Sequence, residues 1–250
     1  MGSRTSALSV RIGRQLVNAA LEFLLPAVLV LWWWLASEHS TSQYFPPLST
    51  ILRRFKDVWL FSHFSSDALP TLEHLAVGYM VATALGVVIG VALGTAPLLA
   101  EAAAPVLEFV RATPVVALLP AGLLIFGIGP RFQIAVIAYS ATWPILLNTV
   151  DGVRALDPVA QDVVRSYRLS KRLQLMKVVI PAAAPNIVAG MRTATSLSIS
   201  VVIFSELMGA TNGIGYQILQ AQDSFAVPDV WAGMILLGIL GYLVNVLFRG

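Results

Sequence analysis

Apolar residues are concentrated in six long stretches of the chain, which shorter polar segments separate. The stretches lie near residues 16–36, 74–96, 106–126, 132–150, 187–208 and 230–248. A helix needs about 20 mainly apolar residues to cross a bilayer core of about 30 Å. The pattern therefore predicts six transmembrane helices. The third stretch contains Glu108, Arg111, Pro114 and Pro120, which makes its start a candidate re-entrant or interfacial segment.

Two other membrane arrangements fit this pattern less well. No run alternates polar and apolar residues as the strands of a membrane barrel do. The first stretch is too long for the apolar region of a signal peptide, and no small-residue cleavage site closes it. We therefore predict an all-α integral membrane protein with an uncleaved first helix. Its N-terminal segment is 1–15 and its single transmembrane domain is 16–248.

Composition supports a lipid environment. The chain has 250 residues, of which 57% are hydrophobic and 12% are charged, whereas soluble domains carry about 25% charged residues. Cysteine is absent, which excludes disulfides and thiolate metal sites. The three histidines show no metal-ligand spacing, so we expect no metal, and the small net charge of +3 gives no reason to expect a nucleic-acid partner.

The distribution of Lys and Arg predicts the orientation, because basic residues concentrate in cytoplasmic loops. With the N-terminus inside, four basic residues fall in outer segments: Arg53, Arg54, Lys56 and Arg131. Ten fall in inner segments: Arg4, Arg11, Arg14, Arg154, Arg165, Arg168, Lys171, Arg172, Lys177 and Arg249. We therefore expect both termini on the cytoplasmic side of the membrane.

Two features of the predicted outer side and the second helix allow more than one interpretation. The outer loop 37–73 contains an amphipathic segment with Ile51, Phe55, Val58 and Trp59 on one face, which either lies on the membrane or caps the helix ends. In the second helix, Gly86, Gly90 and Gly94 form a flat stripe that permits close helix approach. The stripe serves either tight packing within the chain or a contact that slides during transport.

The longest inner loop, 151–186, is predicted to contain two short helices. Asp157 followed by Pro158 is a favourable helix start, and Val159, Val163, Val164 and Tyr167 then form an apolar side. A second helix is expected from Arg172 to Ile180, ending before Pro181. Such a helix pair either inserts into a groove of a soluble partner or lies among lipid headgroups. The residues alone do not decide between these.

This loop also carries a family motif. The segment Asp162-Val163-Val164-x3-Arg168-x9-Val178-x-Ile180-Pro181 resembles the EAA loop of binding-protein-dependent ABC importer permeases, whose pattern is E-A-A-x3-G-x9-I-x-L-P. The spacing agrees throughout, but Asp replaces Glu, two Val replace two Ala, and Arg168 replaces the glycine. An arginine with positive φ at this turn would cost about 1 kcal/mol. Either the turn is built differently here, or strain is tolerated.

Further segments extend the resemblance over roughly residues 45–248. They are Arg111 to Pro120, Phe126 to Gly129, Trp143 to Thr149, Ser166 to Ser170, Ile180 to Pro185, Gly190 to Arg192, Ser205 to Gly209 and Gly213 to Tyr216. Together they are similar to the permease branch for sulfonates, taurine, nitrate and bicarbonate. The resemblance implies a type I importer permease fold with a cytoplasmic coupling helix, in the inner membrane of a bacterial cell.

The resemblance also implies a mechanism and partners. The chain lacks the G-x-x-x-x-G-K-[ST] phosphate loop, so it is expected not to be an enzyme itself. ATP and Mg would bind to a dimer of separate ATPase subunits. A second permease, the same or different, and an extracytoplasmic solute-binding protein would complete the complex. The expected ATPase-coupling residues are Asp157, Val159, Asp162, Val163, Arg165, Ser166, Tyr167, Arg168 and Leu169. The basic residues among them equally suit anchoring at the inner membrane face.

The sequence gives fewer signals for the substrate pathway. Arg192, Ser196 and Ser200 share one face of the fifth helix, and Glu206 lies near its outer end. The face would either hydrate a route for a small polar, anionic solute or bond neighbouring helices. For Glu206 we favour a structural or gating role, because its charge opposes an anion. Alternatives are a permease for a vitamin precursor such as a pyrimidine, or a carrier driven by an ion gradient, although no internal repeat supports the latter.

Overall fold

The computed structural model describes residues 24–157, 159, 164 and 166–247, and every regular element within them is helical. The all-α prediction is confirmed for these residues. After a first helix, Leu24–Ser37, the elements are α2 (Leu48–Phe55), η1 (Lys56–Ser62), η2 (Phe64–Ala68), α3 (Leu69–Thr95), α4 (Pro97–Ala112), α5 (Val115–Phe126), α6 (Pro130–Arg154), α8 (Lys171–Gln174), η3 (Leu175–Val179), α9 (Ile180–Gly209), α10 (Ile214–Asp223) and α11 (Val227–Leu247). The three η elements are π-helical turns.

Four described helical runs are long and apolar enough to cross a membrane. They are Phe64–Thr95, Pro130–Arg154, Lys171–Gly209 and Val227–Val246. The bent pair α4 and α5 supplies a fifth candidate span. The first predicted stretch is described only from residue 24 onward, as the helix Leu24–Ser37.

The third predicted stretch is not one straight helix. It covers parts of α4 and α5, which meet at an angle of 95°. The break follows from Pro114, because proline disfavours the helical conformation of the residue before it. Thr113 accordingly has φ −84° and ψ 118°, in the extended region. The expected irregularity at the start of this stretch is thus a sharp corner near its middle.

The expected helix end before Pro181 is also wrong. The chain is helical from Lys171 to Gly209 without a break, over 39 residues. Pro181 follows the π-helical turn η3 and lies in the first turn of α9. A π-helical turn is wider and bonds each N–H to the carbonyl five residues back, which accommodates the proline ring and its missing N–H. The predicted loop 151–186 therefore shares residues with α6 and α9 at both of its ends.

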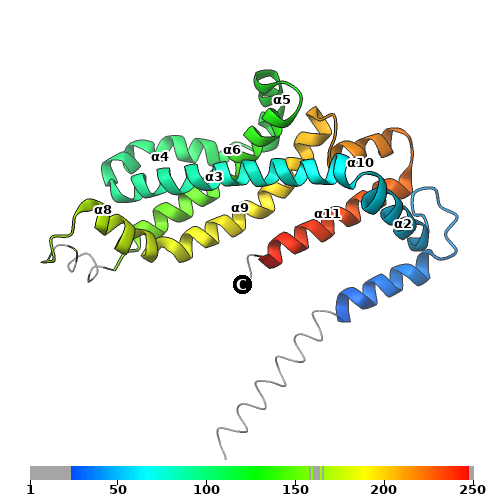
Figure 1. Cartoon of the computed structure of the whole chain (residues 1–250), viewed down its shortest axis with the longest axis horizontal. Coiled ribbons are helices and arrows are strands. Elements are labelled where there is room, and N and C mark those ends of the chain that lie inside the picture. Colours follow the sequence, from blue (N-terminus) through cyan, green and yellow to red (C-terminus); the bar gives the residue numbers. More distant parts are fainter. Residues whose placement is uncertain (1–23, 158, 160–163, 165, 248–250) are drawn as a thin grey trace, which may run out of the picture.

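The core is a three-helix layer of α6 packed between α3 and α9 (Figure 1). Glycines of α3 meet α6 in constant register: a Cβ on Gly86, Gly90 or Gly94 would lie 2.6–2.8 Å from a side-chain carbon of Ile145, Thr149 or Val153, respectively. Both numberings rise together, so α3 and α6 are parallel. Because parallel neighbours need a return segment between them, α4 and α5 provide it. The predicted glycine stripe is thus in direct contact with α6.

Helix α9 packs against the same α6 in the opposite direction. A Cβ on Gly190 would lie 2.8 Å from Asn148, and a Cβ on Gly152 would lie 2.8 Å from Asn186. The numbering falls along one helix as it rises along the other, which makes the pair antiparallel. The backbones approach closely along both seams, and the large side chains of α6 that fill the layer, such as Phe132, Ile137 and Leu146, are fully buried.

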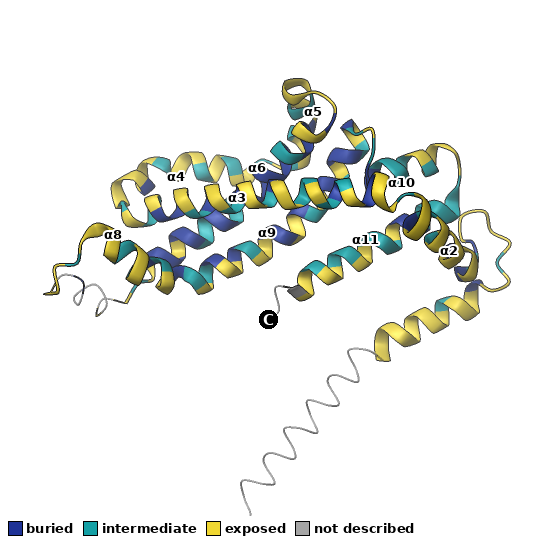
Figure 2. Cartoon of the chain, in the orientation of Figure 1, coloured by how far each residue is buried: buried dark blue, intermediate teal, exposed yellow. Residues whose placement is uncertain are grey.

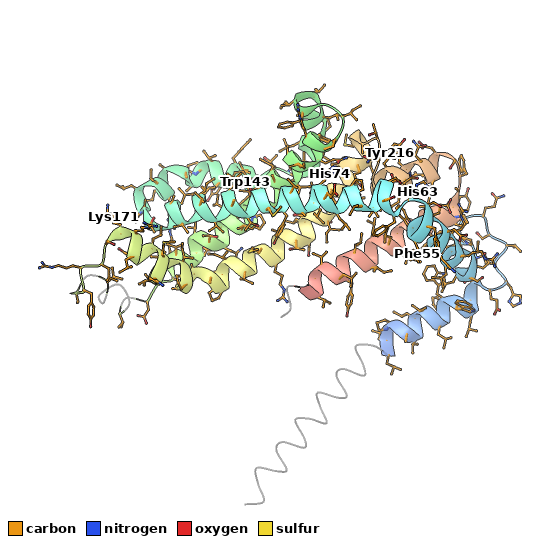
Figure 3. The ribbon with its side chains drawn as sticks, viewed as in Figure 1. Phe55, His63, His74, Trp143, Lys171 and Tyr216 are labelled. Atoms are coloured by element: carbon orange, nitrogen blue, oxygen red, sulfur yellow. The ribbon has the colours of Figure 1, made fainter. Side chains whose placement is uncertain are left out.

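The layer has two different ends, which we name the loop end and the cap end. The loop end carries α8 and the described residues between Ala155 and Ser170, and the cap end carries α2, η1 and α10. Figure 3 shows Lys171 at one extreme of the molecule and Phe55 and His63 at the other. Ile51 and Trp59 are 0% and 2% exposed, and Trp59 packs against Ile214 and Ala232. The amphipathic segment thus packs as a cap over helix ends, one of its two predicted interpretations.

The first helix and α11 bury little of their surface. Figure 2 shows exposed residues along Leu24–Ser37 and at many positions of α11. Their contacts concentrate at the cap end, where the rings of Trp33 and Trp231 lie 5.5 Å apart. Tryptophan at the end of a membrane helix is typical of the lipid–water interface. These two helices therefore flank the three-helix layer rather than forming part of its core.

Candidate functional site

Two polar sites and one exposed surface distinguish the described residues. The first site is the segment 156–170 at the loop end. Asp157 Oδ1 accepts a hydrogen bond of 2.9 Å from the N–H of Val159. This is the geometry of an N-cap side chain, which satisfies a backbone donor at a helix start. The expected helix start at Asp157 is therefore present.

The same segment ends in a Schellman motif. The N–H of Leu169 donates to the carbonyl oxygen of Val164 over 3.2 Å, and Arg168 between them has φ +49°. These are the bond and the left-handed residue of that motif, in which glycine is usual. Arg168 therefore adopts the left-handed conformation that glycine has in the family motif, and the strain is tolerated. This is one of the two outcomes considered above. Ser170 then accepts a hydrogen bond from the N–H of Leu173 and caps α8.

The apolar residues of this segment face in two directions. Val164 is 6% exposed and lines a cavity of about 460 Å³ with Gly94, Val153 and Val179. Val159 and Tyr167 are 68% and 76% exposed. The single apolar side predicted for Val159, Val164 and Tyr167 is therefore wrong. Val164 holds the segment against the helix layer, which leaves two large side chains free to contact a partner.

The other residues predicted for coupling divide by how far they are described. Ser166 and Arg168 are exposed, and Leu169 is half-buried. Asp162, Val163 and Arg165 lie outside the described residues. The described part thus supports a short capped helix with outward Val159 and Tyr167.

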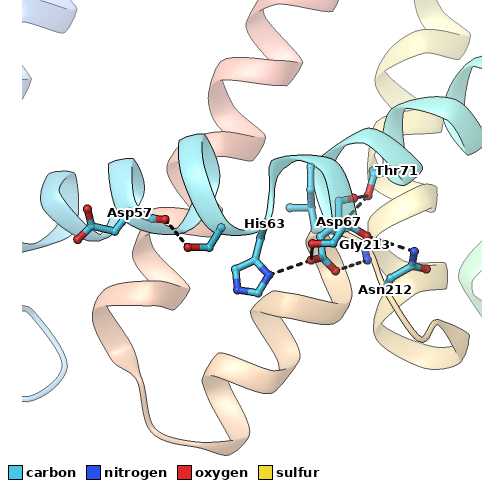
Figure 4. Close-up of polar contacts among 9 residues, drawn as sticks. Asp57, His63, Asp67, Thr71, Asn212 and Gly213 are labelled. Carbon is cyan, nitrogen blue, oxygen red and sulfur yellow. Dashed lines mark hydrogen bonds and ion pairs between the residues drawn. The ribbon is translucent and has the colours of Figure 1, made fainter.

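The second site lies at the cap end, where α10 begins without a side-chain cap of its own. The first N–H groups of a helix have no partner within it. Here three consecutive ones bind side chains of other helices, and Figure 4 shows the first of these bonds, from Gly213 to Asp67. Gly213 donates to Asp67 Oδ1 over 2.9 Å, Ile214 to Thr71 Oγ1 over 3.0 Å and Gly215 to Glu206 Oε2 over 2.7 Å. We name Asp67, Thr71 and Glu206 the triple cap.

The triple cap is buried and internally bonded. Its three residues are 1–2% exposed. Thr71 Oγ1 donates to Glu206 Oε1 over 2.6 Å. Asp67 Oδ2 accepts a hydrogen bond of 2.6 Å from Ser66 and lies 3.0 Å from His63 Nδ1. The partial positive charge at the start of α10 favours two carboxylates there. Thus α3, α9 and α10 are joined at one point.

Glycine is required in the loop that the triple cap holds. Gly213 has φ +123°, and a Cβ there would lie 2.5 Å from Glu206 Cδ. Any larger residue would both strain the backbone and displace the carboxylate. The sequence Gly213-Ile214-Gly215 is therefore matched to Glu206.

The exposed surface is one face of α9. Arg192, Ser196 and Ser200 are all exposed, and Ser200 Oγ donates to the carbonyl oxygen of Ser196 over 3.3 Å. We name these three residues the polar stripe. Glu206, predicted as a fourth pathway residue, is 1% exposed and bound to α3 and α10. The structure therefore separates it from the other three.

Sequence reasoning missed two of the three triple-cap residues. Asp67 and Thr71 lie in the predicted outer loop 37–73, which drew attention only for its amphipathic segment. Their i, i+4 spacing, which places two polar side chains on one helix face, was the available signal.

Comparison with known proteins gives consistent matches. Residues 82–250 match the family described as "Binding-protein-dependent transport system inner membrane component". A Bacillus subtilis (strain 168) protein named as an aliphatic sulfonates transport permease, SsuC, is 29% identical over 98% of this chain and 91% of its own length. The nitrate import permease NrtB of Leptolyngbya laminosa is 33% identical over 71% of this chain and 63% of its own length.

Solved structures support the same arrangement of helices. A chain of the MetNI methionine ABC transporter in an inward-facing conformation superposes with a TM-score of 0.63. It is 19% identical, and the match covers 72% of this chain and 90% of that one. At this identity the likeness establishes the fold alone.

Proposed function

Because this chain belongs to the family of binding-protein-dependent inner membrane transport components, we propose that it is the transmembrane permease subunit of an ATP-driven importer. It is a multi-pass membrane protein with apolar helices of membrane-spanning length. The function proposed for it is to form a solute pathway and to couple that pathway to separate ATPase subunits.

The capped segment at the loop end carries this proposal. It lies between α6 and the 39-residue helix Lys171–Gly209, which are core helices of the layer. Among the described residues of the segment, Asp157 caps a helix start, Leu169 closes a Schellman motif, and Val159 and Tyr167 are exposed. Force applied to those side chains by a soluble partner would reach both core helices directly. A groove that accepts a short helix is a common form of such a partner.

The proposed complex has the following arrangement. The loop end faces the cytoplasm, where basic residues concentrate, and docks on an ATPase subunit that holds ATP and Mg. The cap end faces outward, toward a solute-binding protein. A second permease, the same or different, completes the pathway. ATP must bind one conformation of this complex more tightly than another, because a ligand with equal affinities shifts no population.

The proposed substrate is a small oxyanion or sulfonate. The matched relatives are named for aliphatic sulfonates and for nitrate. Both are small anions with several equivalent oxygens. A binding protein that purifies with the complex, screened against such anions and against neutral vitamin precursors, tests this choice, and a preference for the neutral compounds contradicts it.

The coupling proposal is tested by co-purification and by one substitution. Affinity-tagged chain is expected to bring down an ATPase subunit from its native membrane. Tyr167→Ala should lose that subunit or its substrate-stimulated ATP hydrolysis, because Tyr167 is 76% exposed and holds no described part of the fold. Tyr242→Ala, at a 59% exposed tyrosine of α11, is the matched control and should change neither. Unaltered ATPase stimulation and uptake in Tyr167→Ala would reject this coupling residue.

A further inference from the structure

The polar stripe lies at a depth where a lipid-facing helix would be apolar. Arg192 is the only charged residue of the chain between Lys177 and Glu206. At a rise of 1.5 Å per residue it lies about 21 Å from Glu206 and about 22 Å from Lys177 along the helix. Those two residues mark the cap end and the loop end of the same span. Arg192 is therefore inside the span, five residues past the start of the apolar stretch 187–208.

Arg192 has no acidic partner among the described residues. The ion pairs found there join Arg54 to Asp229 and His63 to Asp67, both at the cap end. An arginine within a membrane span is costly in lipid, and such residues face a water-filled cavity or another protein group. A side chain that is exposed, unpaired and inside the span thus requires an aqueous or anionic environment.

The neighbouring residues on the same face support an aqueous environment. Ser196 follows Arg192 by one helical turn, and Ser200 follows by two. Apolar Val188 precedes the polar stripe on the exposed side of α9, and Phe204 follows it. The opposite side of α9, including Ala194 and Ser198, is buried against the helix layer. Polar exposure is therefore confined to the central turns of this face.

We propose that the polar stripe is the anion-selective part of the solute pathway, with Arg192 as its positive charge and the hydroxyls of Ser196 and Ser200 as hydrogen-bond donors. This inference rests on the proposed function and specifies its substrate class as a small anion. Arg192 attracts the solute by its charge along this water-filled route. Glu206, bonded within the triple cap, does not face the solute.

The absence of cysteine from the chain allows a test that needs no knowledge of the substrate. The Ser196→Cys variant introduces a single thiol into the polar stripe. The permease, with the ATPase subunit that purifies with it, is placed in nanodiscs of neutral lipid, with and without ATP. Two thiol reagents of the methanethiosulfonate type are compared, one carrying a sulfonate and one a trimethylammonium group. Each rate is divided by the rate for 2-mercaptoethanol in the same buffer.

The expected result is that Ser196→Cys reacts with both reagents and prefers the anionic one by about tenfold, as one unit charge about one helical turn away predicts for two oppositely charged reagents. Adding Arg192→Gln should abolish the preference, and adding Arg192→Lys should keep it. Val88→Cys, at a 68% exposed position of α3, is the control for a lipid-facing thiol and should react with neither reagent.

Two results would overturn the inference. One is a Ser196→Cys thiol that stays unreactive with and without ATP, which places the stripe in lipid or in a protein contact. The other is a reagent preference that Arg192→Gln leaves unchanged. Failure of the proposed function is seen separately, because it shows as a lack of ATPase co-purification and does not depend on the labelling rates.

Discussion

Asp67 and Glu206 lie on different helical segments, yet they accept hydrogen bonds from two backbone N–H groups of one short loop, those of Gly213 and Gly215. Thr71 lies between them, bound to Ile214 and to Glu206. Side chains from α3 and α9 thereby replace the cap that α10 does not supply itself. The cap end is held by buried polar bonds, whereas the rest of the layer is held by close helix contacts.

Removal of the Glu206 carboxylate should destabilise the protein strongly. Glu206→Ala leaves the buried Gly215 N–H without its partner, which costs about 1–3 kcal/mol, and also leaves a cavity where the buried side chain stood. We expect the free energy of unfolding to fall by about 3 kcal/mol, as measured by thermal unfolding of the purified protein in detergent. Glu206→Gln should lose less, because its amide oxygen accepts from Gly215 while the Thr71 hydroxyl turns to the Asp67 carbonyl oxygen, 3.1 Å away. Glu101→Ala, at an exposed position of α4, is the control, and an equal loss there would contradict the role of the triple cap.

A methyl group on the glycine seam should separate α3 from α6. Gly90→Ala would place its Cβ 2.6 Å from Thr149 Cβ and 2.8 Å from the carbonyl oxygen of Leu146, and a backbone atom cannot rotate away. We expect a loss of about 1–3 kcal/mol in thermal unfolding. Gly238→Ala is the matched change on α11, where nothing lies within 4 Å. It should be neutral or stabilising, because alanine favours helix over glycine by about 1 kcal/mol.

Replacing the left-handed residue Arg168 by glycine should stabilise the turn of the loop-end segment. Arg168→Gly removes the penalty of a side chain at φ +49°, which is about 1 kcal/mol. Hydrogen exchange of the Leu169 N–H, which bonds to Val164, should slow about fivefold. Arg172→Gly is the same substitution inside α8. It should make hydrogen exchange faster in that helix, because glycine weakens a helix interior. Faster exchange in Arg168→Gly would show that the arginine side chain itself stabilises the turn.

At the cap end, burial should outweigh the ion pair. Arg54 and Asp229 form two hydrogen bonds, of 2.5 and 2.6 Å, and the bond to Asp229 raises the pKa of Arg54. The Arg54 side chain is nevertheless 45% exposed, and such pairs are worth up to about 1 kcal/mol. Asp229→Asn should cost no more than that in thermal unfolding, and less at high salt. Trp59→Ala removes a 2% exposed side chain and should cost about 3–5 kcal/mol. A larger loss of stability in Asp229→Asn than in Trp59→Ala would show that the ion pair, and not burial, holds the cap end together.

Hydrophobic length and local start signals were sufficient to predict much of the fold. Runs of apolar residues indicated α3, α6, α9 and α11, and the resemblance to importer permeases is confirmed by the family match. Asp157 was identified as a helix start because N-caps are local. Glycine at four-residue spacing indicated a packing face, although only the structure shows that Ile145 and Thr149 occupy it.

The errors come from prolines and from contacts between distant residues. Pro114 follows a break between two helices, whereas Pro181 lies in the first turn of α9 after the π-helical turn η3. Other prolines also lie inside helices: Pro105, Pro120, Pro144 and Pro185. The presence of a proline in an apolar run therefore does not by itself predict a helix end. The triple cap joins Asp67 to Gly213 across most of the chain. Its donors are backbone N–H groups, which have no side-chain identity that a sequence pattern could reveal.

The unbroken helix from Lys171 to Gly209 connects the two polar sites, because it begins directly after the loop-end segment and carries Glu206 near its other end. We describe this helix as a rigid rod. At 1.5 Å per residue its 39 residues extend about 58 Å. The far tip is fastened to α10 and α3 through Glu206, and Asn186 in the other half of the helix is packed on Gly152 of α6, so the rod would pivot at the far tip together with α6. A tilt of about 5° would carry the near tip about 5 Å sideways, the length of one helical turn. Under the proposed function, such a small rotation, without any change inside the helix, would convert a push at one membrane face into a shift of the polar stripe.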